Sequence, residues 1–267
     1  MSTQPMSNPS ETPAEMPFPA PCNTLALDAP LRWLRLGWQD MQRAPRLSLT
    51  YGLVLMLLSV LIGGLTWRFG TLALYLGLAT GFVFIGPVLA VGLYSISRQL
   101  EAGLEPFMGY CIQQGWRHVR GLLVLGLVLL VVLLVWARAA AIVNVFFPSE
   151  ANPSWLDLAP YLAIGSAIGA IFTSIVFSAS AFSLPMIMDR KVDPITAVVS
   201  SINAVLRNKG AMLVWGGLIG LVVLTGFASA FLSFIVLLPL VGHATWHAYR
   251  ETIDASAWPK NMPGDSD

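Results

Sequence analysis

The chain has 267 residues, of which 56% are hydrophobic and only 11% are charged. Soluble domains carry about 25% charged residues, so this composition excludes an ordinary soluble globular domain. The formal net charge of +1 also argues against nucleic acid as a partner, because a nucleic-acid-binding protein needs a strongly basic face.

The amino-terminal segment is rich in proline, with six prolines among its first 24 residues. Such a segment buries too little apolar surface to order itself, and it lacks the basic and apolar regions of a secretory signal peptide. We therefore expect residues 1–24 to form a disordered cytoplasmic tail. A single integral membrane domain over residues 25–255 and a C-terminal tail over 256–267 complete the predicted organisation.

Five apolar runs follow in chain order, and a helix needs about 20 apolar residues to cross ~30 Å of hydrocarbon. The runs are Leu47–Trp67, Thr71–Ser97, Gly121–Phe147, Tyr161–Met188 and Ala211–Gly242. As one helix the last run would be about 48 Å long, so we expect it to split near Gly226 into two spans. The predicted fold class is an all-α membrane bundle with six transmembrane helices, and five is the alternative.

The distribution of Lys and Arg predicts the orientation of these spans, because cytoplasmic loops collect both residue types. The loop over residues 146–160 contains Glu150 and Asp157 but no Lys or Arg, which is typical of an outer loop. Six spans then place both termini in the cytoplasm. With five spans, Arg250 and Lys260 would lie outside.

Three segments share one pattern, in which a helix begins with Pro, ends in basic residues and precedes an apolar run. They are residues 30–46, 106–120 and 194–209. Pro at the first helical position suits a helix start, and Asp193 is the expected N-cap of the third helix. We predict three amphipathic interfacial helices, with an apolar stripe in the first formed by Leu31, Leu34, Trp38 and Met41.

Each interfacial helix and the two spans after it form one unit of a predicted pseudo-threefold repeat. The units cover about 30–104, 105–192 and 193–252. A proline should kink the returning helix of each unit, and an arginine should anchor its end at the inner membrane interface. The prolines are Pro87, Pro185 and Pro239, and the arginines are Arg98, Arg190 and Arg250.

The three histidines are the candidate metal ligands. His243 and His247 are four residues apart, so they share a helix face, and the predicted topology puts His118 on the same side of the membrane. With Asp189 or Glu101 they could hold a divalent metal, or the pair could hold haem. The other interpretation places these imidazoles at helix ends, facing headgroups and the negative end of the helix dipole. We favour the second, so no cofactor is predicted and a metal or haem is the alternative.

Arg138 is the one charge well inside an apolar run. Intramembrane charges are functional candidates, and this one could bind a substrate or a lipid phosphate. Its long side chain could instead extend to the outer headgroups. Gly165 and Gly169, like Gly216 and Gly220, have the small-xxx-small spacing that is typical of close helix packing.

Residues 87–103, 189–208 and 242–250 together resemble a family of bacterial integral membrane proteins of unknown function. Some members are labelled putative cytochrome c oxidase subunit I. The resemblance extends over residues 30–255 and implies a bacterial inner-membrane protein, with no substrate and no catalytic residues. The oxidase label does not fit, because a haem–copper core needs more histidine ligands than the three in this chain.

We therefore expect a non-enzymatic scaffold, assembly or lipid-contacting module, whose partners are the lipid bilayer and other inner-membrane proteins. One alternative is a small-solute transporter or channel, since repeats and kinked helices recur in transporters. Another is a metal- or haem-binding respiratory accessory protein. A polar cavity midway through the membrane, with Arg138, Ser174, Ser178 and Ser180 turned inward, would favour transport, whereas outward-facing residues would favour a scaffold.

Overall fold

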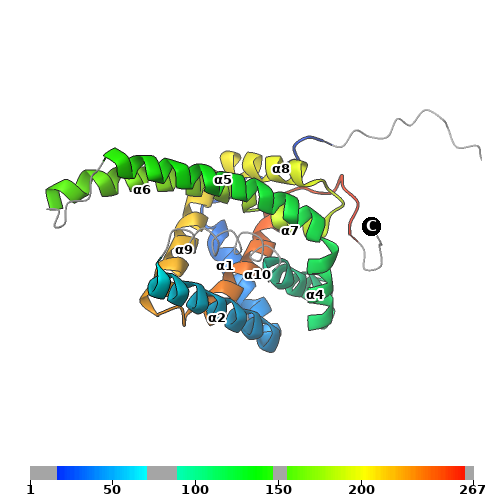
Figure 1. Ribbon diagram of the computed structural model, residues 1–267. Coiled ribbons are helices and arrows are strands. Elements are labelled where there is room, and N and C mark those ends of the chain that lie inside the picture. The colour runs from blue at the N-terminus through cyan, green and yellow to red at the C-terminus, as the bar shows by residue number, and fades with distance from the viewer. Residues whose placement is uncertain (1–16, 71–88, 147–154, 262–267) are drawn as a thin grey trace, which may run out of the picture.

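The computed structural model describes residues 17–70, 89–146 and 155–261. The regular structure in these ranges is helical, and no β-strand forms within them. The labelled helices are α1 (Ala29–Arg43), α2 (Pro45–Phe69), α4 (Met108–Arg117), α5 (Val119–Phe146), α6 (Trp155–Ser180), α7 (Ser183–Asp189), α8 (Pro194–Arg207), α9 (Lys209–Ala228) and α10 (Phe234–Thr252) (Figure 1). Residues 89–101 are helical as well.

Four helices of the described ranges are long and apolar enough to cross a membrane: α2, α5, α6 continuing into α7, and α9. They correspond to the predicted first, third and fourth runs and to the first half of the fifth. Most of the second run, including Pro87, lies outside the described residues. The coarse prediction of an all-α membrane bundle is confirmed, whereas the count of six spans stays a prediction.

The long final run is divided between α9 and α10 by a turn at residues 229–233. A Cβ atom at Gly226 would lie 2.0 Å from the ring of Phe234, so only glycine lets the second helix fold back this closely. The backbone N–H of Phe231 donates to the carbonyl of Gly226 and closes the turn. The helix break therefore occurs close to the residue where the length of the run predicts it.

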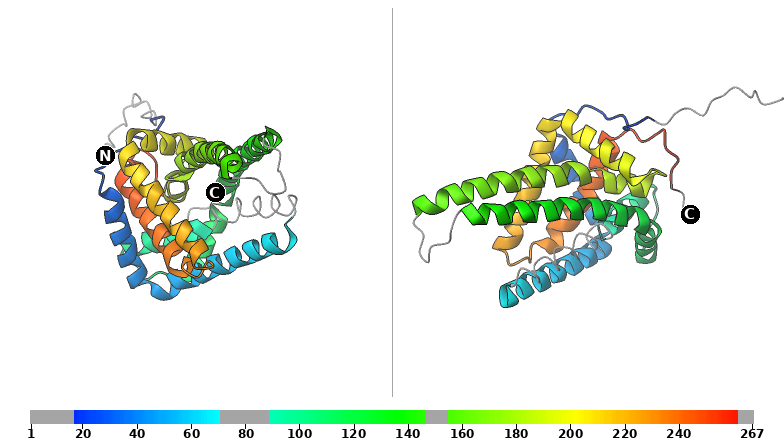
Figure 2. Two further views of the ribbon diagram at one scale, coloured as in Figure 1. Left: turned by 90° about the vertical axis from the view of Figure 1, so that its left-hand side faces the viewer. Right: turned by 45° about the horizontal axis from the view of Figure 1, so that its top comes forward.

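Helix α10 packs along α1 and α2 through two points of close backbone approach (Figure 1). A Cβ atom at Gly37 of α1 would lie 2.7 Å from the backbone nitrogen of Ala244. A Cβ atom at Gly52 of α2 would lie 1.9 Å from the carbonyl oxygen of Ile235. Helices α5 and α6 form a long hairpin on another side of the molecule, where they contact α8 (Figure 2).

The main core lies where α1, α7, α8, α9, α10 and the first part of α5 meet. Trp33 of α1 and Trp215 of α9 pack edge to face with ring centroids 5.6 Å apart. Trp246 and Tyr249 of α10 are also fully buried. The long spans instead leave most of their apolar side chains outside this core, as helices surrounded by lipid do.

Parts of the two predicted tails contact the membrane domain in the structure. The backbone N–H of Ala20 donates to the Ser200 hydroxyl, and that of Asn23 donates to the carbonyl of Thr252. Trp258 is buried, although it falls within the predicted C-terminal tail. Residues 17–24 and 256–261 are therefore ordered by hydrogen bonds to distant parts of the chain, which local composition does not reveal.

The three segments predicted as interfacial helices form α1, α4 and α8, and Asp193 caps α8 as expected by accepting the Thr196 backbone N–H at 2.9 Å. The apolar stripe of α1 is divided. Leu31 and Trp38 are exposed, whereas Met41 is buried. The face that α1 turns toward α10 contains a large aromatic residue, a glycine and an acid: Trp33, Gly37 and Asp40. The interfacial position of these helices and the threefold repeat stay predictions.

Helix α6 ends at Ser180 and α7 begins at Ser183, so the helix is interrupted shortly before Pro185. The ring of a proline clashes with the carbonyl four residues earlier, here that of Ala181, which accounts for the place of the break. Helix α10 continues through Pro239 as a helix.

Candidate functional site

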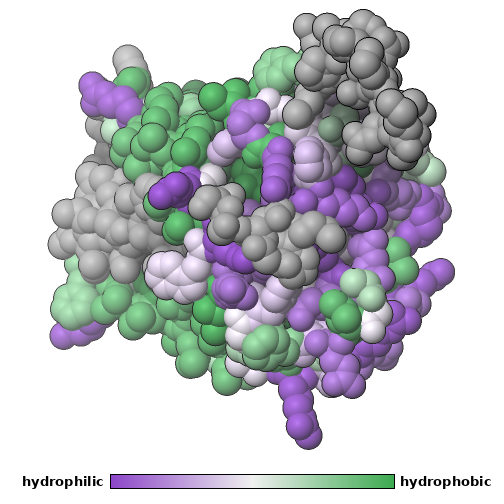
Figure 3. Space-filling view, turned by 90° about the vertical axis from the view of Figure 1, so that its right-hand side faces the viewer, coloured by the Kyte–Doolittle hydropathy of each residue, from purple (hydrophilic) through white to green (hydrophobic). Residues whose placement is uncertain are grey.

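Polar side chains gather at the end of the molecule shown in Figure 3, whereas apolar residues cover the adjoining surface. At this end the three arginines predicted as separate membrane anchors meet at one carboxylate, Asp189. The distance from its oxygens is 3.0 Å to Arg190 Nε, 3.7 Å to Arg250 Nη1 and 4.0 Å to Arg98 Nε. Asp189 is only 4% exposed, so this is a buried ion-pair network.

The same carboxylate accepts a hydrogen bond from the hydroxyl of Tyr249 at 2.9 Å. We call Asp189, Arg98, Arg190, Arg250 and Tyr249 the Asp189 cluster. Its members come from the helix over residues 89–101, from α7 and from α10, so it joins the ends of three helical segments. A buried charge is tolerated only when it is paired and hydrogen-bonded, and Asp189 meets both conditions.

Two further carboxylates tie tryptophans to arginines at the same end. Glu101 accepts the indole N–H of Trp246 at 2.9 Å and lies 3.1 Å from Arg250. Glu251 accepts the indole N–H of Trp33 at 2.8 Å and lies 2.6 Å from Arg32. These contacts fix the C-terminal part of α10 to α1 and to the helix over residues 89–101.

His243 is fully buried and both of its ring nitrogens are bonded to serines. Nε2 lies 2.9 Å from the Ser48 hydroxyl and Nδ1 lies 2.8 Å from the Ser97 hydroxyl. Ser48 donates its hydrogen to the carbonyl of Ala44, so Nε2 donates to Ser48. Nδ1 then accepts from Ser97. His243 therefore acts as a neutral link between α2, α10 and the helix over residues 89–101.

His247 contacts a different group, because its Nε2 lies 2.7 Å from Asp40 of α1. Sequence reasoning missed Asp40 as a partner, although its spacing from Trp33 and Gly37 places all three on one helix face and could have revealed it. The histidine pair thus shares a face of α10 as expected, while each member packs against another helix.

His118 is used in a third place. Its Nδ1 donates to the carbonyl of Gln114 at 2.9 Å, and its Nε2 accepts from the Asn261 amide at 3.1 Å. The structure therefore does not bring His118, His243 and His247 together. Among the described residues no group of three or more His, Cys, Asp or Glu side chains could hold a metal ion. Binding of a metal or haem by these histidines stays the alternative to the prediction of no cofactor.

The residues that would favour a transport path lie elsewhere. Arg138 of α5 and Ser174 of α6 are exposed, and Ser174 donates its hydroxyl to the carbonyl of Ala170 in its own helix. Ser180 likewise donates to the carbonyl of Val176. These polar groups are satisfied within their helices or face outward, and they line neither of the two cavities described next.

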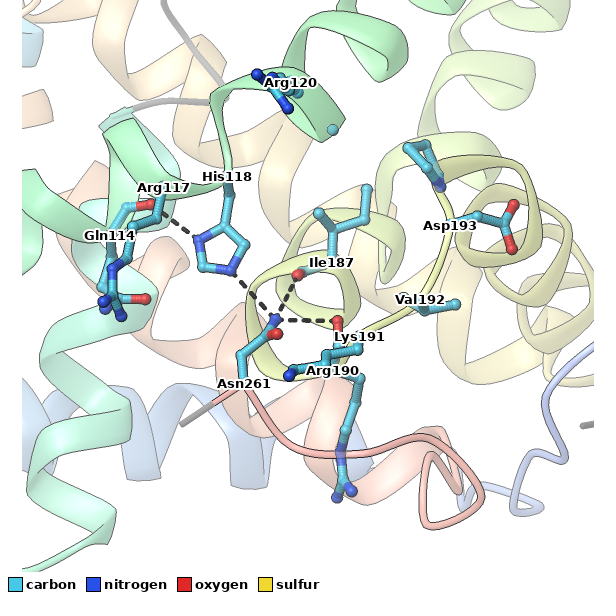
Figure 4. Close-up of a pocket in the computed structure, with 12 residues that line it drawn as sticks. Gln114, Arg117, His118, Arg120, Ile187, Arg190, Lys191, Val192, Asp193 and Asn261 are labelled. Carbon is cyan, nitrogen blue, oxygen red and sulfur yellow. Dashed lines mark hydrogen bonds between the residues drawn. The ribbon is translucent and has the colours of Figure 1, made fainter. Parts of the chain in front are cut away.

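Two cavities open at the charged end. The larger, of about 420 Å³, lies between the junction of α4 and α5 and the connection from α7 to α8 (Figure 4). The smaller, of about 270 Å³, borders the Asp189 cluster and includes Tyr110 and Lys260. The larger cavity is strongly basic, because Arg117, Arg120, Arg190 and Lys191 line it.

A known protein family matches part of the chain. Residues 74–189 match a family described as "Predicted integral membrane protein (DUF2189)". This range includes residues 87–103 of the resemblance drawn from the sequence but not residues 242–250, and the description carries no oxidase label. No curated protein and no solved structure matches the chain. With the four candidate spans, the match supports a multi-pass integral membrane protein of unknown function.

Proposed function

We propose that this membrane protein is a non-enzymatic scaffold or assembly module of a bacterial inner membrane, with six spans and both termini in the cytoplasm. In this arrangement the Asp189 cluster lies at the cytoplasmic end, where Lys and Arg collect. The α5–α6 hairpin extends from that end across the membrane and offers its surface to a transmembrane helix of another inner-membrane protein.

The open small-residue face of α6 is the observation that carries this proposal. A Cβ atom built at Gly165 or at Gly169 would have no neighbour within 4 Å among the described residues. Glycines at this spacing allow two membrane helices to approach closely, and such packing drives helix association in lipid. Within the described part of the chain this face is unoccupied, so it is suited to a helix from outside.

The charged end supplies the rigid base that such a module needs. Asp189 and Glu101 hold the ends of three helical segments together through ion pairs and hydrogen bonds. Helices α6 and α8 are joined near the base, because the hydroxyl of Ser201 donates to the carbonyl of Ser178 at 2.7 Å. The outward position of Arg138 and Ser174 further favours a scaffold over a small-solute transporter.

The test replaces both glycines with leucine, Gly165→Leu and Gly169→Leu, and compares the size of the complex extracted from native membranes after cross-linking in cells. We expect the double variant to lose a defined partner. The matched control is Ile164→Leu with Ile171→Leu, which changes exposed apolar residues on the same helix without filling the glycine face. Complexes of equal size from the wild type and the glycine variant would contradict the proposal.

A further inference from the structure

Positively charged side chains outnumber carboxylates on the wall of the larger cavity. Four cations line it, Arg117, Arg120, Arg190 and Lys191, against one carboxylate, Asp193. The guanidinium groups of Arg117 and Arg120 have no hydrogen bond or ion pair within the described part of the chain. Arg190 and Lys191 differ, because both already take part in other interactions, which for Arg190 are those with Asp189 and the carbonyl of Trp258.

The one carboxylate on the cavity wall is already used by the backbone. Asp193 caps α8 by accepting the N–H of Thr196. Partial burial raises the pKa of its carboxyl group, but hydrogen bonds from Thr196 and Ile195 outweigh this and lower the pKa below its usual value. Asp193 therefore stays ionised at neutral pH, with its charge directed to the start of α8, and it does not pair with Arg117 or Arg120.

Two chain segments bring the cations to one cavity. Arg117 and Arg120 flank the junction of α4 and α5, and Arg190 and Lys191 follow α7 on the other side (Figure 4). Gly121 permits this approach, because a Cβ atom there would lie 3.1 Å from the side chain of Ile187. The Asn261 amide fixes the second segment by donating to the carbonyls of Met188 and Arg190.

Helix α5 also begins at this cavity, at Val119, whereas the start of α8 is already capped by Asp193. The unpaired N–H groups and the dipole at a helix start favour an anion, and they add to the field of the cationic side chains. A volume of about 420 Å³ lies within the range of small-molecule sites, which is ~300–1,000 Å³. Arginine is well suited to phosphate because its planar group can bind two oxygens at once.

We propose that this cavity binds a phosphate group, with Arg117 and Arg120 as its charged donors and with Lys191 adding positive charge to the wall. An anionic lipid headgroup and a water-soluble phosphoester are the two sources of this chemistry. Trp116 and Ile195 are large, exposed apolar residues next to the site, in positions where acyl chains would cover them. If the ligand is a lipid, the proposed orientation of the protein decides only on which side of the membrane its headgroup lies. The cavity itself does not depend on the proposed partner of α6.

The test uses the purified full-length chain in a neutral detergent, with three probes: inorganic phosphate, glycerol 3-phosphate, and phosphatidylglycerol against phosphatidylcholine in mixed micelles. The triple variant Arg117→Gln, Arg120→Gln, Lys191→Gln should lose at least about tenfold in affinity, since each charge-assisted hydrogen bond contributes strongly. The matched control is Arg35→Gln, Arg43→Gln, Arg46→Gln, which removes three exposed arginines outside the cavity and should stay within about twofold.

The probes distinguish the two sources. Tighter binding of phosphatidylglycerol than of glycerol 3-phosphate identifies a lipid headgroup, and equal binding identifies a soluble phosphoester. Equal losses in the triple variant and its control, or no phosphate binding by the wild type, would overturn the site. If the triple variant does not fold, the phosphate affinity of the single variant Arg120→Gln, at an exposed residue, provides the test. The glycine variants of α6 should leave phosphate binding unchanged, so this proposal and that of the scaffold can fail separately.

Discussion

The charged end of the molecule and the α5–α6 hairpin differ in the burial and pairing of their polar groups. At the charged end, Asp189 and His243 are buried, and each is matched by several partners from other helices. On the hairpin, Arg138 and Ser174 are exposed, and Gly165 approaches nothing in the described chain. The comparison indicates that the fold is held together at one end, while the spans offer their surfaces to lipid or to other proteins.

The strongest way to break this comparison is to remove the carboxylate at the centre of the Asp189 cluster. Asp189→Ala leaves three arginines and a tyrosine hydroxyl without their shared partner, and loss of one member of a buried ion pair costs about 3–5 kcal/mol. We expect a large fall in the melting temperature of the purified protein in detergent. Asp28→Asn, at an exposed ion pair with Arg32, is the control and should change little. Equal melting temperatures for the two variants would refute the structural role of the cluster.

A smaller effect is expected at His243. His243→Ala removes the acceptor of the Ser97 hydroxyl and the donor to Ser48 in the interior, at a cost of about 1–3 kcal/mol. The control Thr50→Ala removes an exposed hydroxyl from α2, the helix that contains Ser48, and should cost much less.

The purified wild type and a His243→Ala, His247→Ala variant also test whether these histidines bind a metal or haem. We expect no haem absorbance and no stoichiometric metal in the wild type, and a cofactor that disappears when His243 and His247 are both changed to Ala would contradict this.

The smallest effect is expected on the hairpin. Arg138→Gln alters an exposed side chain and should change the free energy of unfolding by less than about 0.5 kcal/mol. Thermal unfolding of the purified variant provides the measurement. A loss as large as that of His243→Ala would show that Arg138 has a buried partner in the membrane, and the contrast between the two regions would then be wrong.

The sequence predicts the helical class and several element positions because these depend on local properties. Run length and hydropathy locate α2, α5 and α9, and the start of α8 follows from Asp193 and Pro194. The break between α9 and α10 follows from the length of its run. The order in residues 17–24 could not be predicted, since it depends on Ser200 and Thr252, which are far away in the chain.

The candidate site was predictable in its parts but not in its assembly. The positions of proline and arginine in the predicted returning helices place Arg98, Arg190 and Arg250 at one end of the membrane domain. The structure brings these three arginines to Asp189. Their convergence depends on how three helices cross, which no local pattern encodes. For the same reason the i, i+4 spacing of His243 and His247 predicts a shared face correctly, whereas their partners Ser48, Ser97 and Asp40 come from other helices.

The orientation of the charged end is the claim on which the account depends most, and labelling of intact cells tests it directly. In a chain with Cys22→Ser and Cys111→Ser, single cysteines are introduced as Arg35→Cys, Lys260→Cys or Trp155→Cys, and a membrane-impermeant maleimide is added from outside. The account predicts labelling of the Trp155→Cys variant alone, with the other two labelled only after the cells are broken. Labelling of Arg35→Cys or Lys260→Cys in unbroken cells would contradict it.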